Sequence, residues 1–435
     1  MGTYGFPVEG FAFSVPILTQ IRHYEGEQAG GVRLSDNGAA ISATAQGRRY
    51  DIDALRIFAF GLLILYHVAM FYVADWGWHV KSTYQAEWLQ LPMMLTNQWR
   101  MPLIFLISGL AVSFVWGKYT AGKFLARRSW RLLVPLLFGM AFIVSLQCYY
   151  EALSKGIIEP GFLQFMGQYL TFQDFPGEAW GGEEQIVWTW NHLWYLPYLW
   201  FYTLLLIPLA LLVDGPGRFI RQRFQGLRGV WTVLVPIMPL MVYYNLIFPH
   251  FPGITHAFFD DWYAHAMYGT FFLYGFLIAR DAGFWSELSR IRKVTLGLAI
   301  VFFGLFMVSG DFLPDESSNW QNQVSGLITY LNRWIWILAA LGWGHHLFNK
   351  PMKWLPYATE AVYPWYILHQ TIVIVVGYNL SQLQLGPVIE PVLVLGATIG
   401  GCFVLHEYLI RRIRVLRPLF GLSRGGGIVR SSKSD

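Results

Sequence analysis

The sequence predicts an all-α integral membrane protein, with about ten transmembrane helices around a polar central cavity and both termini in the cytoplasm. Three observations support this fold class. The 435 residues are 55% hydrophobic and only 13% charged, whereas a soluble protein carries roughly 25% charged residues. Apolar runs of about 20 residues, the length needed to cross a bilayer, recur along the chain. The few polar residues inside these runs need partners or a cavity, because lipid cannot satisfy them.

The predicted spans follow one another through short connections, without an internal repeat. They cover residues 54–73, 98–116, 132–150, 192–213, 230–248, 264–280, 294–310, 324–348, 360–380 and 388–409. Residues 1–50 are rich in Gly, Ser, Thr and Ala and lack the apolar core of a signal peptide. We therefore expect a partly disordered cytoplasmic arm (1–50), one transmembrane domain (51–417) and a basic cytoplasmic tail (418–435).

The distribution of basic residues predicts the orientation. With the N-terminus in the cytoplasm, 26 of the 31 Lys and Arg lie in inward segments, and only Lys81 and Lys155 lie in outward loops. Cytoplasmic loops carry such an excess, so we expect a multi-pass protein of the plasma membrane, in bacteria the inner membrane. The net charge of +5 then reflects topology and anionic lipid rather than nucleic acid. Cys148 and Cys402 lie in predicted spans and cannot form a disulfide framework. We expect no metal site.

The first span, 54–73, carries two ionisable residues. Arg56 and His67 lie eleven residues apart, which is about three helical turns, so they share one face at roughly 16 Å along the axis. Arg56 can reach the interface, but His67 cannot, and ionisable groups inside a membrane are functional candidates. His67 is either a structural histidine bonded to a neighbour or a buried, neutral imidazole that serves as general base or acyl acceptor. Asp53 is expected to cap the start of this helix, and a pairing role with Arg56 stays open.

Segment 118–131 is predicted to be an amphipathic stretch on the cytoplasmic side. Lys123, Arg127 and Arg131 follow at four-residue steps and share a helix face. Two interpretations stay open. The stretch is either an ordinary positive-inside loop or a site for a polyphosphate, since Arg binds phosphate in a bidentate way.

The predicted outward loops are rich in aromatic residues. These residues include Trp76, Trp78, His79 and Trp88 in 74–97, then Trp180, Trp188 and Trp190 in 151–191. The loop 249–263 is aromatic again, and 151–191 is also acidic. Trp and Tyr near a membrane boundary form interfacial belts. The alternative is a platform on which sugar rings stack.

Polar residues within the spans complete the candidate set. They are His67, Arg100, Ser108, Gln147, Asn332, Arg333, His369, Gln370 and Glu407. Arg100, near the outer end of its span, either binds an anion or snorkels to the interface, whereas Arg333, in mid-span, favours a cavity. Ser108 has small neighbours and is expected to serve helix packing. His369 shares a helix face with Tyr366, and both a structural and a functional role stay open.

Several motifs resemble the membrane acyltransferase-3 family. Arg56-x10-His67 within DALRIFAFGLLILYH is similar to the first-helix signature of that family. Further resemblances are RMPLIFLISGLAVSF (Arg100–Phe114), FLARRSWRLLVP (Phe124–Pro135), HLWYLPYLW (His192–Trp200), YPWYILHQ (Tyr363–Gln370) and HEYLIRR (His406–Arg412). They occur in the expected order across 51–417, and the second motif and aromatic loops lean towards the glucan-biosynthesis succinyltransferases. The sequence departs from the family pattern at Glu407. The family often has Glu-x-Pro at this point, whereas here Tyr408 and Leu409 follow the glutamate.

The resemblance implies an O-acyltransferase that moves an acetyl or succinyl group from cytoplasmic acyl-CoA to a hydroxyl of an extracytoplasmic glycan or glucan. Acyl-CoA is then the co-substrate, without a metal. His67 and Arg56 are the implied catalytic residues, and the donor phosphates would meet Arg56, Arg127, Arg128 and Arg131. Acyl-group or acceptor contacts would come from Arg100, His192, Trp194, Arg333, Tyr366 and His369. Supporting roles would fall to Asp53, Ser108 and Glu407.

Two questions stay open at this level. His67 either deprotonates the acceptor hydroxyl for direct attack or first takes the acyl group as an acyl-imidazole. The sequence shows no Gly-x-Ser-x-Gly elbow and no cysteine nucleophile, which disfavours acyl transfer through a serine or a cysteine. The alternative function is a transporter or flippase of a glycan or lipid-linked substrate, although the sequence lacks the inverted repeat typical of secondary transporters. A lipid-binding scaffold would not need His and Arg in mid-membrane.

Overall fold

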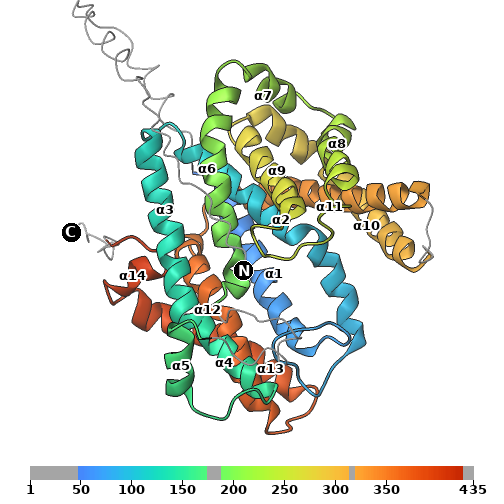
Figure 1. The fold of residues 1–435 in the computed structure, drawn as a ribbon. Coiled ribbons are helices and arrows are strands. Elements are labelled where there is room, and N and C mark those ends of the chain that lie inside the picture. Colours follow the sequence, from blue (N-terminus) through green and yellow to red (C-terminus); the bar gives the residue numbers. More distant parts are fainter. Residues whose placement is uncertain (1–47, 174–187, 313–318, 425–435) are drawn as a thin grey trace, which may run out of the picture. The chain divides into compact units, whose positions relative to one another are not determined.

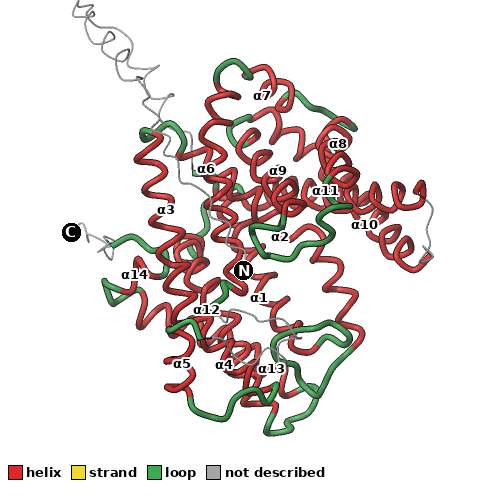
Figure 2. Tube along the Cα trace, in the orientation of Figure 1, coloured by secondary structure: helices red, strands yellow, loops and turns green. Residues whose placement is uncertain are grey.

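The computed structural model describes residues 48–173, 188–312 and 319–424. Nearly all of the predicted arm 1–50 and the end of the predicted tail 418–435 lie outside these ranges, as does part of the acidic loop 151–191. Within the described residues the protein is helical, and one isolated bridge between Val73 and Ala86 is the sole β pairing (Figures 1 and 2). The predicted all-α class is therefore confirmed.

The helices follow the order of the apolar runs. They are α1 (Tyr50–Tyr72), α2 (Gln90–Val115), α3 (Ala121–Phe138), α4 (Ser145–Ser154), α5 (Phe162–Leu170), α6 (Tyr195–Asp214), α7 (Arg218–Gln225), α8 (Trp231–Leu246), α9 (Trp262–Ile278), α10 (Ala282–Phe312), α11 (Asn319–Phe348), α12 (Leu355–Ser381), α13 (Ile389–Val404) and α14 (Leu416–Leu419). A π turn over Gly139–Val144 joins α3 to α4, and a second, Leu405–Ile410, extends α13.

Eight helical stretches in the described residues are long and apolar enough to cross a membrane. The other two predicted spans coincide with α8, of 16 residues, and α9, of 17 residues. Both are shorter than the roughly 20 residues that a perpendicular span requires. The protein is thus a multi-pass membrane protein, while the number ten stays a prediction.

The interior is built around α1 and α12, which pack against each other. α1 also contacts α2 and α11, and α12 contacts α4 and α13. α10 pairs with α11 and extends beside the bundle (Figure 1). Only 11% of the apolar stretch of α10 is buried within the protein, so most of this helix suits contact with lipid.

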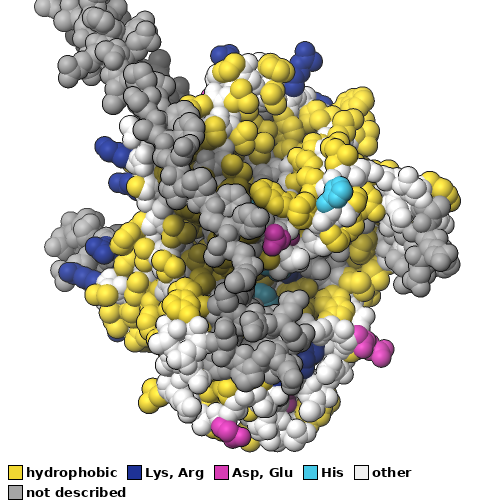
Figure 3. Space-filling view, in the orientation of Figure 1, with side chains coloured by type: hydrophobic (Ala, Val, Ile, Leu, Met, Phe, Trp, Pro, Cys, Tyr) yellow, Lys and Arg dark blue, Asp and Glu magenta, His cyan; other side chains and the backbone are white. Residues whose placement is uncertain are grey.

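Many of the Lys and Arg side chains on the face drawn in Figure 3 lie towards its margins. Hydrophobic side chains make up much of the described surface in this view, and Lys and Arg are visible near α7, the start of α3 and α14. This separation matches a membrane protein whose basic loops stay outside the hydrocarbon. The cytoplasmic position of the termini stays a prediction.

The start of α1 differs from the expectation for Asp53. The helix begins at Tyr50, so Asp53 lies in its first turn and is not the cap. The neighbouring carboxylate of Asp51 is fully buried and accepts hydrogen bonds from Arg49 (2.6 and 2.9 Å) and pairs with His345 of α11 (2.6 Å). These partners explain the earlier start, because they stabilise one more turn of helix than the apolar pattern indicates.

Two glycines let α2 and α9 approach at backbone distance. A Cβ atom at Gly109 would lie 1.9 Å from the carbonyl oxygen of Phe272, and one at Gly275 would lie 1.9 Å from that of Leu106. Small residues permit such close crossings between membrane helices. The α2–α9 pair therefore depends on these two positions.

Gly109→Ala is expected to lower the free energy of unfolding by about 1–3 kcal/mol, since overpacking forces the two backbones apart. Thermal unfolding of the purified protein in detergent measures the effect. Gly297→Ala in α10 is the matched control, because a Cβ there meets no atom within 4 Å. Equal melting temperatures for wild type and Gly109→Ala would contradict the close-packing argument.

Candidate active site: a histidine pair between α1 and α12

His67 of α1 and His369 of α12 form a hydrogen-bonded pair. Nδ1 of His67 lies 2.7 Å from Nε2 of His369, and the two rings stack at 4.9 Å between centroids. Nδ1 of His369 faces the backbone carbonyl oxygens of Tyr366 (2.8 Å) and Trp365 (3.1 Å). A carbonyl accepts only, so this nitrogen carries the proton and Nε2 of the neutral ring accepts. His67 must then donate from Nδ1.

With its proton on Nδ1, the neutral ring of His67 has a lone pair on Nε2. No group in the described ranges forms a hydrogen bond with this nitrogen, and it is not among the buried unpartnered atoms. The indole of Trp78 lies parallel to the His67 ring, at 6.5 Å between centroids and 13° between planes. A nitrogen with these properties can act as a base or as a nucleophile.

The loop that carries Trp78 is fixed to the end of α1. Lys81 donates to the backbone carbonyls of Met70 (2.9 Å) and Val73, and the hydroxyl of Ser82 donates to the buried Glu390 of α13 (2.7 Å). The position of the aromatic ring over His67 is thus set by hydrogen bonds.

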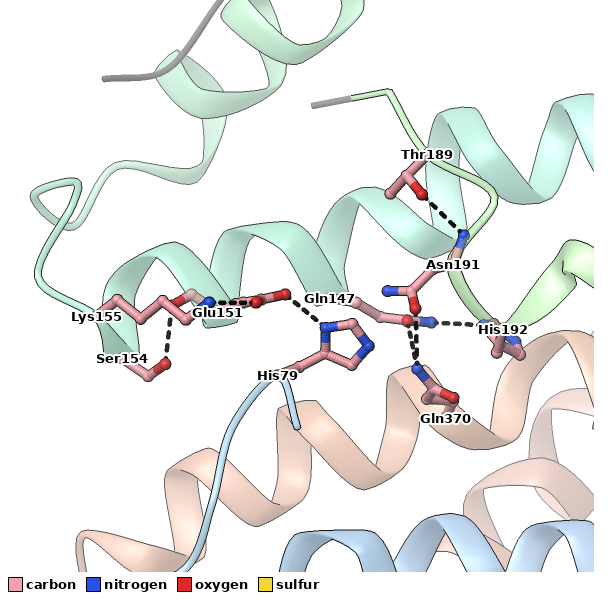
Figure 4. A network of polar contacts seen from close by, with 9 residues as sticks. All are labelled: His79, Gln147, Glu151, Ser154, Lys155, Thr189, Asn191, His192 and Gln370. Atoms are coloured by element: carbon pink, nitrogen blue, oxygen red, sulfur yellow. Dashed lines mark hydrogen bonds and ion pairs between the residues drawn. The ribbon is translucent and has the colours of Figure 1, made fainter. Parts of the chain in front are cut away.

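A second layer of polar residues supports His369. His192 precedes α6 in a short turn, and its ring lies 5.3 Å from that of His369. Gln147 of α4 donates to Nδ1 of His192 (3.2 Å), and Nε2 of His192 donates to the carbonyl of Ile367 (3.1 Å). Gln370 donates to the side-chain oxygen of Gln147 (3.1 Å; Figure 4). These bonds hold α4, α6 and α12 in register at the histidine pair.

Arg100 is a buried cation beside the pair. Its side chain on α2 is 3% exposed, and its guanidinium lies 3.7 Å over the ring of Tyr66, the residue before His67. Nε and Nη1 are buried without a hydrogen-bond partner among the described residues. An uncompensated charge in such a site is costly unless an anion occupies it at some stage.

Three arginines gather near the Tyr50 end of α1. The charges of Arg56, Arg128 and Arg131 lie within electrostatic range of one another, and Tyr195 is close to both Arg56 and Arg128. Nε of Arg128 is buried without a partner in the described part of the chain. We call Arg56, Arg128 and Arg131 the arginine cluster; three like charges in one place suit a polyanion.

Comparison with known proteins identifies the family. A family model described as an acyltransferase domain, that of acyltransferase 3, matches residues 49–407. The chain belongs to the acyltransferase-3 family. It is 22% identical over 391 residues to "Glucans biosynthesis protein C" of Salmonella paratyphi B, covering 87% of this chain and 96% of the relative. The protein of that name from Escherichia coli K12 is 24% identical over 396 residues, covering 86% and 94%. No solved structure matches.

Residues of three motifs that resemble the acyltransferase-3 family lie together here: His67, His192, and Tyr366 with His369. The first-helix motif on α1 contains Arg56 and His67, and the motif YPWYILHQ on α12 contains Tyr366 and His369. The hydroxyl of Tyr366 donates to the backbone carbonyl of His192 (2.8 Å). Both ring nitrogens of His192 already have protein partners, so its contact with an acceptor stays a prediction.

The remaining predicted residues of this acyltransferase lie apart from the pair. Arg127 is exposed and donates to Tyr119 (3.0 Å). Trp194 is buried and stacks on His256 at 4.1 Å. Arg333 donates to Gln98 of α2, at 2.8 Å to its backbone carbonyl and 3.2 Å to its side chain.

Of the three predicted supporting residues, Asp53 lies in the first turn of α1, and Ser108 and Glu407 have protein partners. Ser108 of α2 bonds to the hydroxyl of Tyr195 of α6, and its role in helix packing stays a prediction. Glu407 pairs with Arg411 at 2.7 Å. The substrate-contact roles predicted for Arg333 and Trp194 stay predictions.

Sequence reasoning missed two contacts. The stacking of Trp78 on His67 follows from the path of a loop, which helical periodicity does not describe. The hydrogen bond between His79 and Glu151 is also absent from the sequence predictions (Figure 4), because the third span is predicted to end at 150 whereas α4 continues to Ser154. A histidine next to Trp78 in an outward loop was the one available signal.

Proposed function

We propose that this acyltransferase-3 protein moves an acyl group from cytoplasmic acyl-CoA to a hydroxyl of a glycan or glucan on the other side of the membrane. The observation that carries the proposal is the lone pair on Nε2 of His67. His67 lies inside α1. The arginine cluster lies towards the Tyr50 end of this helix, and the loop that carries Trp78 follows its Tyr72 end. The name of the relatives supports a glucan as acceptor.

The donor would bind through its phosphates at the arginine cluster. Arg56 precedes His67 by three helical turns, roughly 16 Å along the axis. Coenzyme A is a polyanion with a long flexible arm, so phosphates held at Arg56, Arg128 and Arg131 leave the thioester free to reach His67. This direction requires the Tyr50 end of α1 to face the cytoplasm, in agreement with the predicted positive-inside orientation.

His67 would carry the chemistry, and His369 would position it. By accepting the Nδ1 proton of His67 in a hydrogen bond, His369 fixes the tautomer and the ring orientation, as the carboxylate does in a Ser-His-Asp triad. His67 then either deprotonates the acceptor hydroxyl or attacks the thioester carbonyl itself.

Arg100 would meet the negative charge of the reaction. Nε and Nη1, which are buried without a hydrogen-bond partner among the described residues, would donate to the oxyanion that develops on the acyl carbonyl, or to the carboxylate of a succinyl group. Buried donors of this kind stabilise a developing charge strongly, because water is excluded. Trp78, stacked beside His67, would offer an aromatic face to the acceptor sugar.

A sided vesicle assay tests the function. Purified protein is reconstituted in liposomes with a glucan inside and acetyl-CoA or succinyl-CoA outside, and its orientation is determined by protease accessibility of the C-terminal tail. We expect ester-bearing glucan only in vesicles whose cytoplasmic face meets the donor, detected by mass spectrometry. Glucan that crosses the membrane unmodified, without any donor, would instead support the transporter alternative and contradict the proposal.

A further inference from the structure

A second histidine, His79, is paired with a buried carboxylate near the first pair. Nδ1 of His79 lies 2.6 Å from Oε2 of Glu151 on α4, and Lys155 lies 2.6 Å from the other carboxylate oxygen. The Glu151 side chain is 8% exposed, and that of His79 is 24% exposed. Figure 4 shows the His79 ring between Glu151 and the side of Gln147 and Gln370.

The contacts assign the protons of His79. A carboxylate between Lys155 and His79 accepts from both, so His79 donates from Nδ1. In its neutral form, the imidazole then keeps a lone pair on Nε2. Nothing in the described ranges bonds to Nε2, and this atom is not buried. In Figure 4 it points away from Glu151, towards Gln370. An imidazole oriented by a carboxylate, with its other nitrogen accessible, has the arrangement of a general base.

Two sets of contacts connect His79 with the His67 site. It follows Trp78, whose indole lies parallel to the His67 ring and 5.7 Å from the His79 ring. Its partner Glu151 lies one turn after Gln147 on α4, and Gln147 bonds to His192, whose ring contacts His369. Neighbours at four-residue spacing share a helix face, so His79 and His192 approach one side of α4.

We propose that His79, oriented by Glu151, is a second catalytic base that takes the proton of the acceptor hydroxyl. The inference rests on the proposed function and selects the acyl-imidazole route within it. His79 lies on the loop that follows the Tyr72 end of α1, which is the acceptor side, whereas the arginine cluster lies towards the Tyr50 end. In this scheme His67 reacts with the acyl donor, and His79 accepts the proton of the acceptor hydroxyl.

The bonds and protons balance in two half-reactions. In the first, Nε2 of His67 attacks the thioester carbonyl, the C–S bond breaks, coenzyme A leaves as the thiolate, and the Nδ1 proton of His67 passes to Nε2 of His369. In the second, the acceptor oxygen attacks the acyl-imidazole and its proton goes to Nε2 of His79. The C–N bond then breaks, and His369 returns the proton to His67. His79 releases its proton to water, and the thiolate is protonated in the cytoplasm.

The test separates the half-reactions in reconstituted vesicles. Chromatography follows the release of coenzyme A without acceptor, and mass spectrometry follows glucan ester with acceptor. For His79→Gln, whose amide can still donate to Glu151, we expect the first turnover of coenzyme A release to persist while ester formation falls about 100-fold or more. Glu151→Gln should show the same split with a smaller loss. Ser154→Ala is the matched control, since within the described part of the chain that hydroxyl bonds to the Glu151 backbone carbonyl and not to its carboxylate.

Two results would overturn the inference. Ester formation by His79→Gln at the wild-type rate would remove His79 from the reaction. Loss of coenzyme A release together with ester formation, in a variant that melts like wild type, would show that His79 does not act on the acceptor alone. Neither result affects the proposed function, which fails separately if wild type forms no ester from acyl-CoA.

Discussion

Replacing His67 with alanine is expected to stop ester formation while acyl-CoA still binds. The variant removes the free Nε2 and leaves the arginine cluster, three helical turns away, unchanged. Loss of a general base lowers a rate by about 10²–10⁴-fold, and loss of a nucleophile is at least as severe. The rate of ester formation in vesicles and the affinity for labelled acyl-CoA are measured on the same preparation.

Replacing His369 is expected to slow ester formation as well. His369→Ala leaves Nε2 of His67 in place but removes the acceptor that fixes its tautomer, so we expect a smaller loss than for His67→Ala. The double variant should be no slower than His67→Ala, because residues that act as a unit are not additive. His346→Ala is the matched control, as that histidine is exposed on α11. Independent, additive losses would contradict the pair.

Replacing Arg128 with alanine is expected to weaken acyl-CoA binding about tenfold or more. Nε of Arg128 is buried without a partner in the described residues, and Arg131 and Arg56 add charge around it. A hydrogen bond to a charged group contributes about 1.5–3 kcal/mol, which corresponds to this range. Isothermal titration or filter binding with labelled acyl-CoA gives the affinity at fixed salt.

The same measurement compares the arginines of α3. Arg131→Ala should resemble Arg128→Ala, because its charge acts on both Arg128 and Arg56. Arg127→Ala should have a smaller effect, since Arg127 bonds to Tyr119 and lies outside the arginine cluster. Arg223→Ala, an exposed arginine of α7, serves as the control for net charge. Equal affinities for Arg128→Ala and Arg223→Ala would reject the arginine cluster as the phosphate site.

The sequence predicts the helical fold, the family and the importance of His67, because these follow from apolar runs and one helical spacing. It does not predict the partner of His67, since His369 lies 302 residues away and meets it only when α1 packs on α12. It also misses the pair of His79 and Glu151. The π turn between α3 and α4 changes the helical register before Glu151, and the position of a loop residue depends on hydrogen bonds such as those of Lys81 and Ser82.

The most direct test of the account is a comparison of glycans from cells that produce wild type or His67→Ala at matched levels. Both proteins are first shown to bind acyl-CoA equally, so that folding and donor capture are controlled. Mass spectrometry of the extracytoplasmic glycans then reports ester groups. The account predicts esters with wild type and none with His67→Ala, whereas persistent esters in the variant would contradict it.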